Sequence, residues 1–255
     1  MRSFDVVFSF GGNCAAALQM NHRGLRYFSA PLDWVLMEDE RPLDYLPHGL
    51  RTRFRDMCLL ENLVECRPPA REHHGVVYCY EDTLSGFKFV HHFHRRISEP
   101  GEFESVKKIL NRRINRFYDV LSSASTAYGV LETSFPFDLG KGLAVVRAFK
   151  EVFPRLDLTT RIMQFSAPKA EQADVPDEKV ELVRYCRPRD VKYDMAFTSV
   201  EWSFLDEVSL VGNSEVEASF RLPFKKLKYK LWKHLSGELE RAGTRCVGMI
   251  FPHRK

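Results

Sequence analysis

A short apolar strand that runs directly into a glycine turn and a helix is the feature that most constrains this chain. Residues 4–10 (FDVVFSF) are rich in β-branched and aromatic side chains, which predicts a strand. Gly11-Gly12-Asn13 interrupts that pattern, and residues 14–23 then contain mainly alanine, leucine, glutamine and methionine, which favour a helix. Gly24 is suited to end the helix. The sequence therefore predicts a strand, a tight turn and a helix that starts at Cys14.

Beyond this opening, predicted strands and helices alternate along the chain. The clearest helix covers residues 102–122, where apolar side chains recur at helical spacing and the other face is basic. A hairpin is predicted for residues 76–80 and 87–93, around a turn at Leu84-Ser85-Gly86. The other expected helices cover residues 43–63 (in two pieces, split near Pro47), 142–152 and 224–241, and the other expected strands cover residues 127–131, 156–165, 179–185, 197–204 and 246–251.

This alternation favours an α/β fold, with a layered sheet, flanking helices and Cys14 at a strand–turn–helix junction. The chain has 255 residues, 44% of them hydrophobic, which fits a single catalytic-type domain over residues 1–255. Residues 166–178 resemble a linker-like insertion, because Pro168 and Pro176 stand there among small and acidic residues.

Charge and cysteine usage indicate a cytoplasmic protein. The formal net charge of +4 is too small an excess to require a nucleic-acid partner. No stretch reaches the roughly 18 apolar residues of a membrane-spanning helix, and no secretory leader is recognisable. The six cysteines are scattered through a long chain, so we expect them to be reduced thiols rather than a disulfide framework.

Cys14 is the strongest candidate for a chemical role. A helix N-terminus favours the thiolate, because backbone N–H groups and the helix dipole stabilise negative charge there. The same N–H groups can stabilise an oxyanion formed when the thiolate adds to a carbonyl. Gly12 would let a substrate approach the backbone, and the Asn13 amide could add a donor. Two alternatives stay open: Cys14 is a small packed residue, or the turn is a phosphate-binding loop that lacks the full glycine fingerprint.

A nucleophilic cysteine requires a base, and the histidine-rich end of the second hairpin strand is the best source. Residues 89–94 (FVHHFH) place His92 and His94 on one face and His91 on the other, if the strand alternates regularly. A solvated histidine cluster or a metal site is the alternative. The nearby Cys66, Cys79 and histidines lack the paired spacing of a structural zinc site, so we expect no metal.

Asp33, in the stretch Pro31-Leu32-Asp33-Trp34, is a candidate for orienting that histidine. An aspartate in such a turn often caps its own backbone instead.

Several of these segments together resemble a bacterial family of papain-like cysteine peptidases, formerly a domain of unknown function. The resemblance covers about the first half of the chain. It rests on residues 9–18 (SFGGNCAAAL), 23–26 (RGLR), 29–34 (SAPLDW), 89–93 (FVHHF) and the arginine-rich helix that follows.

The resemblance implies Cys14 as nucleophile, His91 as base and Asp33 as third member. The further candidates, for oxyanion or substrate binding, are Gly12, Asn13, Trp34 and His92. It also implies an α+β papain-like fold as the alternative to a layered α/β sheet. The chain departs from the family pattern at Leu32, where phenylalanine is usual, and at His92, where aspartate is expected. The Gly-Asn-Cys turn is more distantly similar to capsular-polysaccharide acetyltransferases that bind coenzyme A.

Three functions follow from these patterns. The first is a hydrolase that cleaves an amide or thioester of a small molecule or peptide through an acyl-Cys14 intermediate and needs no cofactor. The second is an acyltransferase that uses a coenzyme A thioester to acylate a sugar or amine, with the basic helix over residues 107–116 meeting the cofactor's phosphates. The third is a non-enzymatic binding protein that uses the basic amphipathic helix at residues 225–233.

Overall fold

The computed structural model describes residues 2–72, 75–165, 171–185 and 200–211. The chain divides into two compact units, Met1–Val211 and Gly212–Lys255. The second unit lies outside the described residues, and with it the expected helix over residues 224–241, its basic segment 225–233 and the strand over residues 246–251. The expectation of a single domain over residues 1–255 therefore stays a prediction.

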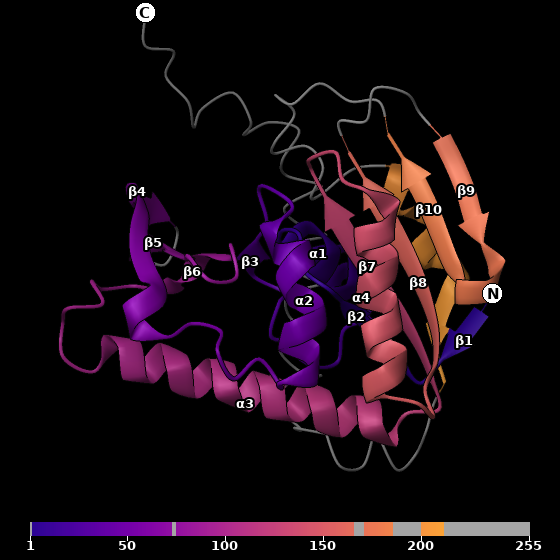
Figure 1. Ribbon diagram of the computed structural model, residues 1–255, viewed down its shortest axis with the longest axis horizontal. Coiled ribbons are helices and arrows are strands. Elements are labelled where there is room, and N and C mark those ends of the chain that lie inside the picture. The colour runs from indigo at the N-terminus through magenta and orange to yellow at the C-terminus, as the bar shows by residue number, and fades with distance from the viewer. Residues whose placement is uncertain (1, 73–74, 166–170, 186–199, 212–255) are drawn as a thin grey trace, which may run out of the picture. The chain divides into compact units, whose positions relative to one another are not determined.

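A five-stranded, mainly parallel sheet is the largest sheet among the described residues of the first unit (Figure 1). Its strand order is β2-β7-β8-β10-β9, and all neighbours are parallel except β9 and β10. The strands are β2 (Val6–Ser9), β7 (Thr126–Thr133), β8 (Asp157–Gln164), β10 (Val180–Arg184) and β9 (Glu171–Val175). Because β2 and β7 run in the same direction, their carboxyl ends meet at one edge of this sheet.

Helices cover both faces of this sheet, so the layered α/β fold is confirmed. On one face Phe8 packs against Phe117 and Phe149, with ring centroids 5.4 and 5.5 Å away. On the other face Val7 shares a buried cluster with Met20 and other apolar side chains. The helices are α1 (Ala15–His22), α2 (Arg41–Arg51), α3 (Glu102–Ser123) and α4 (Leu139–Val152). The helices predicted over residues 14–23, 102–122 and 142–152 correspond closely to α1, α3 and α4.

A second, antiparallel sheet carries His91 and His92. Its order is β3-β6-β5-β4. The strands are β3 (Val35–Leu36), β6 (Lys88–Phe93), β5 (Gly75–Asp82) and β4 (Leu63–Glu72), and η1 (Leu60–Asn62) precedes β4. The predicted hairpin is confirmed as β5 and β6, whereas β4 was not expected from the sequence.

Tertiary contacts divide the first expected strand in two. The Asp5 carboxylate accepts hydrogen bonds from the backbone N–H groups of Ser125 (2.8 Å) and Thr126 (2.9 Å). The chain therefore turns at Asp5 between β1 (Arg2–Phe4) and β2, and β1 pairs instead with β11 (Val208–Leu210).

Three other expectations are corrected. The predicted break near Pro47 is wrong, because α2 continues through that residue and buries Leu46 and Leu50. The predicted strand over residues 197–204 is wrong where it is described, since η4 (Val200–Glu207) is a 3-10 helix. The linker-like character expected of residues 166–178 is wrong for the part that is described. There β9 pairs along its whole length with β10 and is followed by η2 (Pro176–Glu178). Residues 166–170 lie outside the description.

Candidate active site

The glycine turn before Cys14 is held between two strands by its backbone. The carbonyl of Gly12 accepts a hydrogen bond from Met37 N–H (2.9 Å), and Gly12 forms a bridge with Leu36. Gly12 has φ +114°, and a Cβ atom there would lie 1.8 Å from the carbonyl oxygen of Glu132. Only glycine permits both this conformation and this approach to β7. The turn is therefore fixed against β7 on one side and β3 on the other.

Asn13 joins this turn to the start of α1. Its Oδ1 accepts a hydrogen bond from the backbone N–H of Ala15 (2.6 Å), and its Nδ2 donates to Oε1 of Glu132 (2.6 Å). The side chain thus binds the first backbone N–H of α1 in an Asx-type turn and anchors this turn to β7. The hydrogen bond that we expect Asn13 to donate to an oxyanion stays a prediction. It would use the second N–H of Nδ2, because the first binds Glu132.

Cys14 occupies the N-cap position of α1, at the carboxyl edge of the parallel sheet. Its φ and ψ are −75° and −10°, and its carbonyl accepts a hydrogen bond from Leu18 N–H (3.0 Å). The residue is half-buried and is not part of a disulfide. The thiol therefore stands where the positive end of the helix dipole stabilises a thiolate.

Glu132 is a site residue that the sequence did not reveal. It lies near the carboxyl end of β7 and is completely buried. Burial raises its pKa to about 7, and the bond from Asn13 opposes that change only in part. Its Oε2 is inaccessible and accepts no hydrogen bond within the described part of the chain. Nothing in the local sequence distinguishes this glutamate, because only the pairing of β7 with β2 brings it to Asn13.

His91 and Trp34 come together from two neighbouring strands. β3 pairs antiparallel with β6, with Val35 opposite Phe89. This register brings the end of β6 alongside the segment before β3, where the rings of His91 and Trp34 are 6.3 Å apart and almost perpendicular. The expected grouping of these two motifs is thus present.

A bulge in β6 changes the simple alternation that was expected of the histidines. Between the pairs Tyr78–Phe93 and Tyr80–Phe89, β5 advances by two residues and β6 by four. The extra residues lie in the histidine segment, so strand period alone does not assign the face of His91. Bulges of this kind commonly redirect side chains beside active sites.

His92 contacts Arg113 on α3. Its Nε2 accepts a hydrogen bond from Nη1 of Arg113 (3.4 Å), while Nδ1 is inaccessible and has no partner among the described residues. Burial first, then the positive charge of Arg113, lowers the pKa of His92 to about 3. His92 is therefore neutral at physiological pH, and its expected role in substrate binding stays a prediction.

Asp33 is buried and is held by the turn that contains it. Its Oδ2 accepts hydrogen bonds from Nε of Arg26 (2.8 Å) and from the backbone N–H of Ala30 (2.9 Å). Burial raises the pKa of Asp33, and Arg26 opposes that rise. The guanidinium of Arg26 also lies over the ring of Trp34, 5.5 Å from its centroid. Arg26 thus joins Asp33 to Trp34, while the place of Asp33 as third catalytic member stays a prediction.

These contacts form two groups that share β3. The turn group contains Gly12, Asn13, Cys14 and Glu132, and the ring group contains Arg26, Asp33, Trp34, His91, His92 and Arg113. Gly12 bridges to Leu36 in β3, and Trp34 directly precedes that strand. Arg26 lies in the RGLR stretch and Arg113 in the arginine-rich helix, so both belong to motifs that the sequence displays. Neither was selected from the sequence as a site residue.

The described residues contain no group of three metal-ligating side chains close enough to hold an ion. No helix among them combines the length and apolarity needed to cross a bilayer.

A half-buried cysteine at a helix start, and a histidine-bearing strand that pairs with the strand bridged by the preceding turn, are features expected of a cysteine-dependent hydrolase. Residues 5–167 match the family described as Putative papain-like cysteine peptidase (DUF1796), and the chain belongs to this family. The resemblance seen in the sequence motifs is thereby confirmed, and it supports a cysteine-dependent hydrolase in general. No curated protein and no solved structure matches the chain.

Proposed function

We propose that the protein cleaves an amide or a thioester of a small molecule or peptide through an acyl-Cys14 intermediate. The observation that carries the proposal is the position of Cys14, at the N-cap of α1 and at the carboxyl edge of the parallel sheet. Substrates of α/β sheets bind at this edge, where strands end and helices begin.

The reaction takes two steps. The Cys14 thiolate attacks the substrate carbonyl carbon, and first-turn N–H groups of α1 stabilise the oxyanion. As this intermediate collapses, the bond to the leaving group breaks, and His91 gives a proton to the departing amine or thiolate. His91 then removes a proton from water, which attacks the thioester, releases the acid and restores Cys14.

The ring group supports His91 in this role. Trp34 packs against the His91 ring, and Arg26, itself held by Asp33, packs over Trp34. We assign Asp33 and Arg26 to positioning, because they act through Trp34 rather than on the reacting atoms. Asp33 is the family's third member in this scheme, and it needs to remain ionised to hold Arg26.

Alkylation of Cys14 as a function of pH tests the proposal. Iodoacetamide labelling, followed by peptide mass mapping, is compared in wild type, His91→Ala and the matched control His94→Ala. His94 is exposed and lies just beyond the end of β6. We expect the wild-type thiol to react well below the ordinary thiol titration near pH ~8.5, and His91→Ala to shift the curve. An ordinary curve in wild type that His91→Ala leaves in place would contradict the proposal.

An activated acyl ester separates hydrolysis from acyl transfer. With p-nitrophenyl acetate we expect one acetyl group on Cys14, absent in Cys14→Ser, which water removes within the turnover time. An adduct that persists until an amine or sugar is added would identify the coenzyme A-type acyltransferase instead. Equal acetylation of Cys14 and Cys66 would show that Cys14 has no special reactivity.

A further inference from the structure

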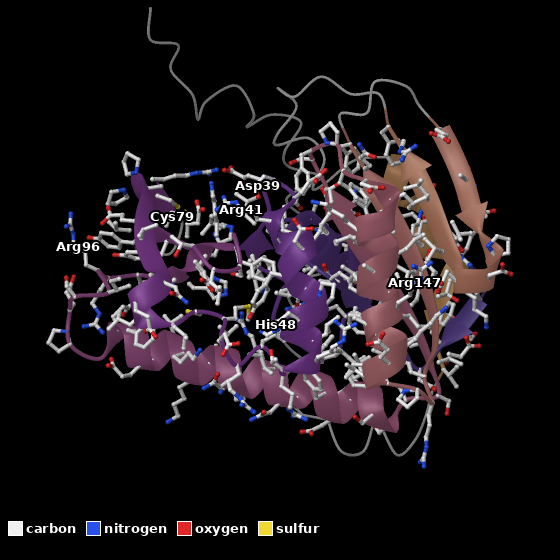
Figure 2. All side chains as sticks on the ribbon, in the orientation of Figure 1. Asp39, Arg41, His48, Cys79, Arg96 and Arg147 are labelled. Atoms are coloured by element: carbon white, nitrogen blue, oxygen red, sulfur yellow. The ribbon has the colours of Figure 1, made fainter. Side chains whose placement is uncertain are left out.

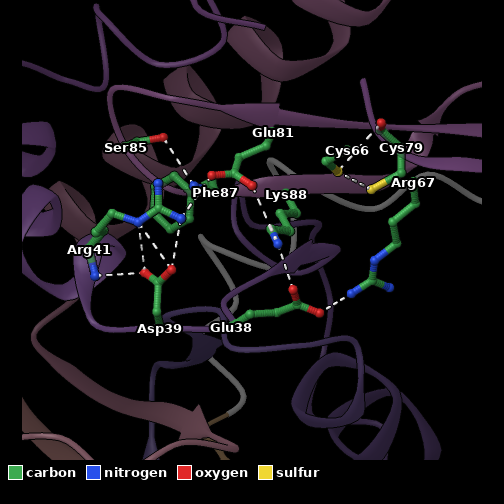
Figure 3. Close-up of polar contacts among 10 residues, drawn as sticks. All are labelled: Glu38, Asp39, Arg41, Cys66, Arg67, Cys79, Glu81, Ser85, Phe87 and Lys88. Carbon is green, nitrogen blue, oxygen red and sulfur yellow. Dashed lines mark hydrogen bonds and ion pairs between the residues drawn. The ribbon is translucent and has the colours of Figure 1, made fainter. Parts of the chain in front are cut away.

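Two other cysteines face each other across the antiparallel sheet, away from the turn that carries Cys14. Cys66 lies in β4 and Cys79 in β5, and their sulfur atoms are 2.9 Å apart (Figure 3). The Cys66 thiol is also 3.5 Å from the carbonyl oxygen of Cys79. Cys66 is half-buried and Cys79 is buried. Cys79 is labelled among the side chains of the antiparallel sheet in Figure 2. The two sulfurs are already close to the separation of about 2.05 Å that a disulfide requires.

The two thiols lie at a bulge in β4. The regular register pairs Val64 with Glu81 and Glu65 with Tyr80, and would next place Cys66 opposite Cys79. The structure pairs Arg67 with Cys79 instead, so that Cys66 and Arg67 both oppose one residue of β5. The hairpin therefore holds the two sulfurs in contact before any bond forms, and closing the bond requires little backbone movement.

The surroundings give the two thiols different roles. Burial, followed by the hydrogen bond and charge of Cys66, raises the pKa of Cys79 to about 12, while Arg67 and Lys88 oppose this rise. The hydrogen bond and the charge of Cys66 no longer raise the pKa of Cys79 once the Cys66 sulfur is bonded to another sulfur. Cys66 is thus the thiol that meets a reagent, and Cys79 becomes more reactive only afterwards.

We propose that Cys66 and Cys79 are a redox-active dithiol, which closes to a reversible disulfide by exchange with a low-molecular-weight disulfide. The Cys66 thiolate attacks one sulfur of the reagent, breaks its S–S bond and releases one thiolate. Cys79 then loses its proton and attacks the Cys66 sulfur, which releases the second thiolate. The protein loses two protons and two electrons, and the reagent gains them as two thiols.

This site is also close to the segment that supports the glycine turn. Arg67 and Lys88 both form ion pairs with Glu38 (Figure 3). Glu38 directly follows Met37, whose N–H binds the carbonyl of Gly12. Closing the disulfide fixes the strand that carries Arg67. The modification itself, however, does not depend on the proposed reaction at Cys14.

Redox titration of the full-length protein tests the proposal without any activity measurement. The protein is equilibrated in buffers of reduced and oxidised glutathione, quenched in acid, alkylated after unfolding and mapped by mass spectrometry. We expect Cys66 and Cys79 to lose alkylation together and to appear in one cross-linked peptide pair, two hydrogens lighter than the separate thiol peptides. A phosphine reductant restores both thiols.

Single-cysteine variants separate an internal disulfide from simple surface oxidation. Cys79→Ser is expected to stop at a Cys66–glutathione mixed disulfide, and Cys66→Ser to leave Cys79 a thiol. Cys58, which is buried, is the internal reference within the same map. A wild-type protein in which Cys66 carries glutathione while Cys79 stays alkylatable would overturn the proposal. The proposal would also be overturned if Cys66 and Cys79 stayed as reduced as Cys58 in the most oxidising buffer. The map of the wild-type protein gives this answer even if a variant fails to fold.

Discussion

Replacing Glu132 with glutamine tests the buried carboxyl beside the glycine turn that precedes Cys14. Burial raises the pKa of Glu132 from 4.5 to about 7. Ionising it therefore costs about 3 kcal/mol more in the folded protein than in the unfolded chain, because each pH unit corresponds to ~1.4 kcal/mol. Glutamine removes this cost, since it cannot ionise, and it keeps an oxygen that accepts the Asn13 amide.

The sign of the effect follows from proton uptake. Below about pH 4.5 the carboxyl is protonated in both states, so it gives no pH dependence. Between about pH 4.5 and 7 the unfolded chain loses this proton while the folded protein keeps it, and the wild-type free energy of unfolding falls. Above about pH 7 both states are ionised and the loss is complete. The stability of Glu132→Gln relative to wild type is therefore expected to rise by about 3 kcal/mol from pH 4 to pH 8.

Urea unfolding followed by tryptophan fluorescence across this pH range measures the difference. Glu104→Gln is the matched control, because Glu104 is an exposed glutamate on α3 and its replacement is expected to leave the pH profile unchanged. Glu132→Ala adds a second comparison, since it removes both the charge and the acceptor for Asn13. A relative stability of Glu132→Gln that stays flat between pH 4 and pH 8 would refute the reasoning.

Three further substitutions test the contacts of the site. Gly12→Ala is expected to cost at least about 4 kcal/mol of stability, because its Cβ would collide with the β7 backbone; an unchanged urea midpoint would contradict this. Arg26→Gln is expected to cost about 3 kcal/mol by leaving the buried Asp33 without its partner, and adding Asp33→Asn is expected to recover part of this; fully additive losses would show that the pair is not coupled. His92→Asp introduces a carboxylate beside Arg113 and is expected to raise stability by about 1 kcal/mol at pH 7, a gain that Arg113→Gln abolishes; a gain that survives Arg113→Gln would have another cause.

Local sequence predicted the elements whose determinants lie within a few residues. Helix α3 was recovered almost to the residue, because its apolar side chains repeat at helical period along its length. The strand–turn–helix that presents Cys14 was recovered because strand-forming residues, glycines and helix formers follow one another directly. The family motifs also brought Trp34 and His91 into one candidate site, and their rings are in contact.

The tertiary structure decided whatever depends on a distant partner. Asp5 interrupts the first strand because its carboxylate accepts hydrogen bonds from backbone N–H groups near residue 125. Nothing in the sequence next to Asp5 predicts these bonds. The bulges in β4 and β6 follow from pairing between strands, so the alternation of a single strand does not assign the faces of the histidine segment.

Glu132 shows the same limit at the site itself. Its local sequence is that of an ordinary strand, and it becomes a buried partner of Asn13 only when β7 pairs with β2. Sequence determines which groups are available and which short segments form, because propensity and period are local properties. Burial and hydrogen-bond partners depend on residues more than a hundred positions away, so only the folded chain assigns a carboxyl such as Glu132 its pKa and its contact with Asn13.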